Sequence, residues 1–204
     1  MCLVSEDDGV TPTDDVLVAE VRGAAPGDTS AFERLVRRHQ RRVLANCRHI
    51  TKAKNDAEDL AQEVFVKAYF SLERFEGRST FKTWLARVKA NHCLNYLRRQ
   101  RGVSYVELDD SDDVSQDDRL RQAPVALREL ELRDERARIT SVLDELSDTL
   151  RVPLVLREVD GLSYEEIAET LGIGLSAAKM RITRGRQQFR LLFNARDGVR
   201  ESVG

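Results

Sequence analysis

The chain has 204 residues, of which 41% are hydrophobic and 33% charged, and its formal net charge is -2. These values are typical of a globular, charge-rich protein with one large or two small domains, and they exclude a disordered chain. No apolar run approaches the length of about 18 residues that spans a membrane. The first ten residues, MCLVSEDDGV, do not have the pattern of a secretory signal. The three cysteines, Cys2, Cys47 and Cys93, are too few for a disulfide framework and favour a reducing, cytoplasmic setting.

The first half of the chain, residues 14–101, is predicted to be a helical domain. A short helix is expected at about 14–22. Apolar residues then recur at steps of three and four in the stretches 30–50 and 55–72, which is helical spacing. A third long helix is expected at about 80–100, with Thr80 as its N-cap. Because Pro and Gly are few, the predicted fold class is all-α.

The charge changes sign abruptly at the end of this first half. Residues 78–101 hold seven basic side chains and no acidic one, whereas residues 103–118 hold seven acidic side chains and no basic one. The acidic stretch has little apolar surface to bury. We therefore expect an acidic, flexible linker at residues 102–123 between two helical domains.

The second domain is predicted at residues 124–195. Helices resume at about Pro124, and Pro153 is expected to kink a helix that begins after Ser147 and ends at Gly161. The pattern S-x-x-E from Ser163 to Glu166 predicts the start of a short helix, and GIG at 172–174 predicts a turn after it. One face of the last helix is predicted to pack inward through Leu175, Ala178, Ile182, Gly185, Phe189 and Leu192.

Two short helices joined by a glycine-containing turn make a candidate helix-turn-helix, whose second helix enters the major groove of DNA. Between residues 176 and 196 there are six basic residues and no acidic one. These cations suit contacts with phosphates or base edges. The alternative is a basic, solvated helix that ends an ordinary bundle.

Two further stretches have the composition of binding surfaces. Residues 74–101 interleave aromatic with basic side chains, which suits single-stranded nucleic acid, although the aromatic residues also fit a core. The segment DAEDLAQEVF, at 56–65, has an acidic face beside an apolar ridge. An acidic face does not bind DNA, so it favours docking on a basic protein partner, with a solvated helix as the alternative.

Four motifs together resemble the extracytoplasmic-function class of bacterial RNA polymerase sigma factors. They are DAEDLAQEVFVKAY, the pattern F-x-G-x-S-x-F-x-x-W-L at 75–85, LREVDGLSYEEIAETLGI, and the basic pattern from Lys179 to Arg186. The resemblance covers about residues 14–101 and 124–193. It implies a sigma-2-like domain, which binds core polymerase and melts the minus-10 element, and a sigma-4-like domain, which reads the minus-35 element.

The resemblance also implies which residues make these contacts. Core polymerase is expected to bind Asp56, Asp59, Gln62, Glu63 and Phe65. Minus-10 DNA is expected to contact Arg78, Ser79, Arg87, Lys89, Asn91, Asn95, Arg98 and Arg99. Minus-35 DNA is expected to contact Ser176, Ala177, Lys179, Met180, Arg181, Thr183 and Arg184. The family often has GTVKSR where this chain has SAAKMR, so its minus-35 sequence is expected to differ.

The expected partners are core RNA polymerase, through its beta-prime and beta subunits, promoter DNA and an anti-sigma factor. No cofactor, metal or direct membrane insertion is expected. An alternative is a helix-turn-helix regulator that acts without polymerase. A nuclease or recombinase would need clustered carboxylates for metal or an activated nucleophile, and the sequence has neither. The spacing of the histidines and cysteines fits no standard zinc pattern.

Overall fold

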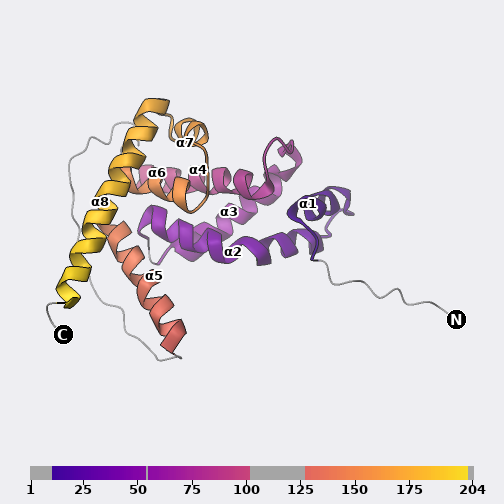
Figure 1. The fold of residues 1–204 in the computed structure, drawn as a ribbon. Coiled ribbons are helices and arrows are strands. Elements are labelled where there is room, and N and C mark those ends of the chain that lie inside the picture. The colour runs from indigo at the N-terminus through magenta and orange to yellow at the C-terminus, as the bar shows by residue number, and fades with distance from the viewer. Residues whose placement is uncertain (1–10, 54, 102–126, 202–204) are drawn as a thin grey trace.

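The computed structural model describes residues 11–53, 55–101 and 127–201, and all regular structure in these ranges is helical. The all-α prediction is therefore confirmed. One helical region contains α1 (Asp14–Gly23), α2 (Ser30–Thr51), α3 (Ala57–Ser71), the short 3-10 helix η1 (Leu72–Arg74) and α4 (Phe81–Arg101). The other contains α5 (Leu127–Glu145), α6 (Asp148–Glu158), α7 (Tyr164–Leu171) and α8 (Leu175–Glu201) (Figure 1). The predicted linker and the helix start at Pro124 lie outside the described residues.

In the first region, α2 lies at the centre and contacts α1, α3 and α4. The predicted N-cap of α4 is confirmed, because the backbone N–H of Thr83 donates to the Thr80 hydroxyl at 3.2 Å. Phe81 is fully buried and packs edge-on against Phe75, while Trp84 is partly buried beside both rings. The aromatic side chains around the start of α4 therefore serve the core.

In the second region, α6 packs against α8. This approach depends on Gly185, where an added Cβ would lie 3.1 Å from the backbone oxygen of Leu150. Helix α6 continues through Pro153, which lies in its interior. Ser147 occupies the N-cap position, but its hydroxyl pairs with Thr149 at 3.0 Å instead of capping the backbone.

The predicted helix-turn-helix is present in α7 and α8. The Ser163 hydroxyl accepts from the Glu166 N–H at 3.1 Å, and the Glu166 carboxylate accepts from the Ser163 N–H at 2.7 Å, which confirms the capping box. Gly172 ends α7 with a φ of 68°, a left-handed conformation that favours glycine. The inward orientation predicted for Leu175 is wrong, since this first residue of α8 is 38% exposed.

The two regions pack on each other. Helix α6 lies against α2, α7 contacts α4, and α5 reaches the α2 side of the first region (Figure 1). The buried apolar residues of both regions belong to one continuous cluster. The described residues therefore form a closed arrangement, and the contacts between α2, α4, α6 and α7 are called the interdomain interface below.

Candidate functional site

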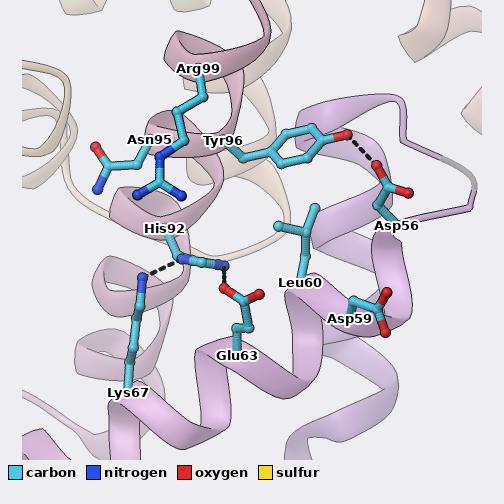
Figure 2. Close-up of a pocket in the computed structure, with 9 residues that line it drawn as sticks. All are labelled: Asp56, Asp59, Leu60, Glu63, Lys67, His92, Asn95, Tyr96 and Arg99. Carbon is cyan, nitrogen blue, oxygen red and sulfur yellow. Dashed lines mark hydrogen bonds and ion pairs between the residues drawn. The ribbon is translucent and has the colours of Figure 1, made fainter.

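The acidic face predicted on α3 lies beside a shallow pocket of about 230 Å³ between α3 and α4 (Figure 2). Asp59, Gln62 and Glu63 are exposed. Asp56 is also exposed, and its carboxylate accepts a hydrogen bond of 2.5 Å from the hydroxyl of Tyr96 on α4. The polar residues predicted to bind a basic partner therefore lie on one accessible side of α3.

His92 connects the two walls of this pocket. The Lys67 ammonium donates to its Nδ1 at 2.6 Å, while its Nε2 lies 3.1 Å from the carboxylate of Glu63 (Figure 2). Burial, together with the positive charge of Lys67, lowers the pKa of His92. The ring is therefore neutral at pH 7, with its proton on Nε2 facing Glu63, because Nδ1 accepts from Lys67.

The apolar part of the α3 surface differs from the expectation. Phe65 is only 8% exposed and belongs to the core, so it offers a partner little surface in this arrangement. In contrast, Val66 is 55% exposed and Phe70 is 76% exposed. These two residues are one helical turn apart and prolong the exposed side that carries Glu63. Neither residue is among those predicted to bind core polymerase, although their i, i+4 spacing after Gln62 indicates the same side of the helix.

The residues predicted to bind minus-10 DNA fall into two groups. Exposed members follow the second half of α4, and the loop before α4 adds exposed Arg78, which pairs with Glu76, and half-buried Ser79. The exposed members on α4 are Asn91, Asn95, Arg98 and Arg99. Arg87 and Lys89 instead point into the interdomain interface, where each meets a carboxylate of the second region.

Lys89 is 1% exposed, and its ammonium donates to both carboxylate oxygens of Asp160, at 2.6 and 2.5 Å. The Asn46 amide on α2 donates to the same carboxylate at 2.6 Å. Nearby, the fully buried guanidinium of Arg151 donates to the Ile50 carbonyl at 2.9 Å. Buried charges of this kind are tolerated only when they are paired and hydrogen-bonded, as these are. The interface therefore holds α2, α4 and α6 in a specific register.

A second ion pair lies at the edge of this interface. Arg87 donates to the Glu166 carboxylate at 2.8 Å, and the same carboxylate closes the capping box of α7. Burial acts to raise the pKa of Glu166, but the hydrogen bonds from the Ser163 backbone and from Arg87 outweigh it and lower the pKa. The helix-turn-helix is therefore joined directly to α4, through a carboxylate that is ionised at neutral pH.

Most residues predicted to contact minus-35 DNA lie on the outward side of α8. The exposed residues of its first half are Ser176, Lys179, Met180, Thr183, Arg184 and Gln187. Ala177 and Arg181 are half-buried at the edge of this face. Arg186 pairs with Glu158 at 2.6 Å and is thereby directed back toward α6. The inward side is held by fully buried Ala178 and Ile182.

Within the ranges that the structure describes, no helix is both long and apolar enough to cross a membrane. In the same ranges, no group of three or more His, Cys, Asp or Glu side chains is arranged to hold a metal ion. The described residues present three surfaces: the acidic and apolar side of α3, the polar side of α4 and the basic side of α8.

Two family models match the chain, and they fall on the two helical regions. Sigma-70 region 2 matches residues 35–103, and Sigma-70, region 4 matches residues 136–189. The first match includes α3 and α4 with their candidate surfaces. The second includes the capping box, the turn and the exposed basic side of α8.

Curated relatives and solved structures give the same family. The chain is 36% identical over 170 residues to the RNA polymerase sigma-H factor of Pseudomonas aeruginosa, covering 79% of this chain and 85% of that protein. It is 36% identical over 180 residues to the ECF RNA polymerase sigma-E factor of Haemophilus influenzae, covering 86% and 92%. CnrH, solved in complex with the cytosolic domain of CnrY, superposes with a TM-score of 0.58 at 27% identity, covering 89% of this chain and 97% of CnrH. The chain therefore belongs to the extracytoplasmic-function (ECF) class of RNA polymerase sigma factors, and is an alternative sigma factor that directs promoter-specific transcription with core RNA polymerase.

Proposed function

We propose that this sigma factor acts in the cytoplasm without catalysis of its own, through three separate surfaces. The side of α3 docks on core polymerase, the polar side of α4 binds and helps to open the minus-10 element, and α8 reads the minus-35 element. The observation that supports this division most directly is the exposed basic side of α8, which follows a capped α7 and a left-handed glycine turn.

For α3, the composition of the surface indicates the partner's chemistry. Exposed Asp59 and Glu63 fit a basic surface, and Val66 with Phe70 supplies the apolar contact that carries most of the affinity in protein interfaces. The family resemblance implies the clamp helices of the beta-prime subunit at this position. We infer that Phe70 takes the role that was predicted for Phe65.

Promoter binding requires the two regions to separate. Elements named minus-35 and minus-10 lie roughly 25 base pairs apart, which is about 85 Å along the DNA axis. Two regions joined by the Lys89–Asp160 pair cannot reach both elements at once. We therefore interpret the described arrangement as a closed form that precedes promoter binding.

A protein partner that stabilises the closed form would act as an anti-sigma factor. Two solved structures that are similar to this chain each contain a partner: CnrH with the cytosolic domain of CnrY, and the sigma factor RpoE with the anti-sigma factor NepR from Bartonella quintana. By analogy, we propose that an anti-sigma factor of this chain binds across both helical regions and opposes their separation.

The test is transcription from genomic DNA with reconstituted core polymerase, followed by mapping of transcript starts. We expect starts that depend on both core polymerase and this chain and that share two elements. Asp59→Lys and Glu63→Lys should weaken core binding but leave DNA binding by α8 intact. If both variants assemble with core normally, the docking side is wrongly assigned. If the chain regulates promoters equally well when it cannot bind core, it is instead a helix-turn-helix regulator.

A further inference from the structure

Two cysteines face each other inside the first helical region. The Sγ atoms of Cys47 on α2 and Cys93 on α4 lie 3.7 Å apart, and the Cys93 thiol donates to the Cys47 sulfur. Both side chains are fully buried, and both are free thiols. A disulfide bond is about 2.05 Å long, so the sulfur atoms would need to approach by about 1.7 Å.

The surroundings make the two thiols chemically unequal. The hydrogen bond from Cys93 lowers the pKa of Cys47, and the nearby Lys89 ammonium lowers it further, against the opposing effects of burial and of the Asp160 carboxylate. The same hydrogen bond and burial raise the pKa of Cys93. Cys47 is thus the better source of a thiolate, while Cys93 keeps its proton. A nucleophilic thiol beside a resolving thiol is the arrangement of a redox-active pair.

This pair lies directly beneath the interdomain interface. Asn46, next to Cys47 in the chain, donates to Asp160, and Lys89, one helical turn before Cys93, pairs with the same carboxylate. The second helical region thus covers this side of the thiol pair. Oxidation requires contact between a thiol and the oxidant. The closed arrangement therefore shields the two thiols, and separation of the two regions exposes the residues around them to solvent.

We propose that Cys47 and Cys93 form a dithiol that hydrogen peroxide oxidises to a disulfide joining α2 to α4, and that the interdomain interface controls access of the peroxide. This modification site does not depend on the role of the chain in transcription. It would respond to peroxide when the second region moves away from α2 and α4.

The reaction has two steps. The Cys47 thiolate attacks one peroxide oxygen, the O–O bond breaks, and Cys47 becomes a sulfenic acid while the departing hydroxide takes up the proton that Cys47 released. The Cys93 sulfur then attacks the sulfenic sulfur, an S–S bond forms, and the S–O bond breaks. The departing hydroxyl leaves as water with the Cys93 proton. Two thiols are oxidised, and one peroxide is reduced to two waters.

The pair is tested in the full chain with Cys2→Ser, which leaves only the two cysteines of interest. After peroxide treatment, alkylation and intact-mass measurement, we expect a loss of about 2 Da and no alkylation, both reversed by dithiothreitol. With Cys93→Ser added, Cys47 should be trapped by dimedone as a sulfenic acid. With Cys47→Ser added instead, Cys93 should remain an alkylatable thiol.

Control by the interface is tested with Asp160→Asn in the same background. Removing one partner of a buried ion pair destabilises the closed form, so oxidation should be about tenfold or more faster. The matched control is Glu20→Gln, which removes an exposed ion pair with Arg34 and should leave the rate unchanged. The dithiol proposal is overturned if Asp160→Asn keeps two alkylatable thiols at a peroxide concentration that oxidises the urea-unfolded chain. Equal rates with and without Asp160→Asn would overturn control by the interface.

Discussion

Asp160→Asn should open the closed arrangement. In the closed form the Lys89 ammonium and the Asp160 carboxylate are both almost completely buried and share two hydrogen bonds. Breaking a buried pair by removing one partner costs about 3–5 kcal/mol, because the remaining charge is left without compensation. The open form avoids this cost, since a separated Lys89 is solvated. Because about 1.4 kcal/mol corresponds to a tenfold change, the ratio of closed to open molecules should fall by roughly 100-fold or more.

Small-angle X-ray scattering of the full chain measures this change without labels. We expect a larger radius of gyration for Asp160→Asn than for the wild type, with unchanged helix content by circular dichroism. The control Glu158→Gln removes an exposed pair with Arg186 inside the second region and should leave the radius unchanged. The exchange Lys89→Asp with Asp160→Lys should restore part of the closed form. If Asp160→Asn scatters like the wild type, the buried pair does not hold the two regions together.

Three further predictions concern the surfaces and the pH dependence. Phe70→Ala should weaken core polymerase binding about tenfold or more without loss of stability. Phe65→Ala should instead lower the free energy of unfolding by about 3–5 kcal/mol. Equal effects of the two substitutions on core binding would contradict our assignment. Arg184→Ala should weaken minus-35 binding, measured by fluorescence anisotropy over a salt series. If Arg184 contacts a phosphate, the substitution should also reduce the slope of log affinity against log salt concentration by about one. An unchanged affinity would exclude Arg184 from the interface. Burial lowers the pKa of His49 and His92 below the ordinary 6.5. The unfolded chain therefore takes up protons first, and stability should fall as the pH drops below about 6.5 toward the folded-state pKa values. Urea unfolding at pH 7.5 and 5.5 should show a smaller loss when both histidines are replaced by Gln, and the same loss would refute this reasoning.

The helix-turn-helix could be predicted from sequence because its determinants are local. The capping box at Ser163 and Glu166 joins residues three apart, and the turn depends on the backbone freedom of Gly172 alone. The burial of Ala178 and Ile182 follows from helical spacing on one element. Each of these features is decided within a few residues, so no long-range contact has to be known.

The α3 surface was harder to predict, because the buried arc of a helix depends on how many neighbours it has. Helix α3 packs against both α2 and α4, so its buried side is wide enough to include adjacent Val64 and Phe65. A single apolar stripe at steps of three and four does not distinguish Phe65 from Phe70. The answer requires the positions of the neighbouring helices.

The interdomain interface could not be predicted from the charge pattern. Lys89 lies in a strongly basic stretch, and lysine is almost never fully buried unless it is paired. Its partner Asp160 is 71 residues away in the chain and lies in the other helical region. The sequence therefore indicated a solvated or DNA-binding lysine. Only the packing of α6 on α2 and the contact of α7 with α4 show the buried pair.

The closed form and minus-10 DNA are expected to compete for the same basic side chains of α4. Arg87 and Lys89, two of the residues predicted to contact minus-10 DNA, pair with Glu166 and Asp160 in the closed arrangement. A carboxylate and a phosphate are both anions that accept hydrogen bonds from these donors. On the proposal that these two cations contact minus-10 DNA, separation of the two regions removes the carboxylates and DNA phosphates take their place. Because DNA that contacts Arg87 and Lys89 would bind the open form alone, opening and minus-10 binding should be coupled. On this reasoning, Asp160→Asn should raise the apparent affinity for minus-10 DNA without adding any contact to it.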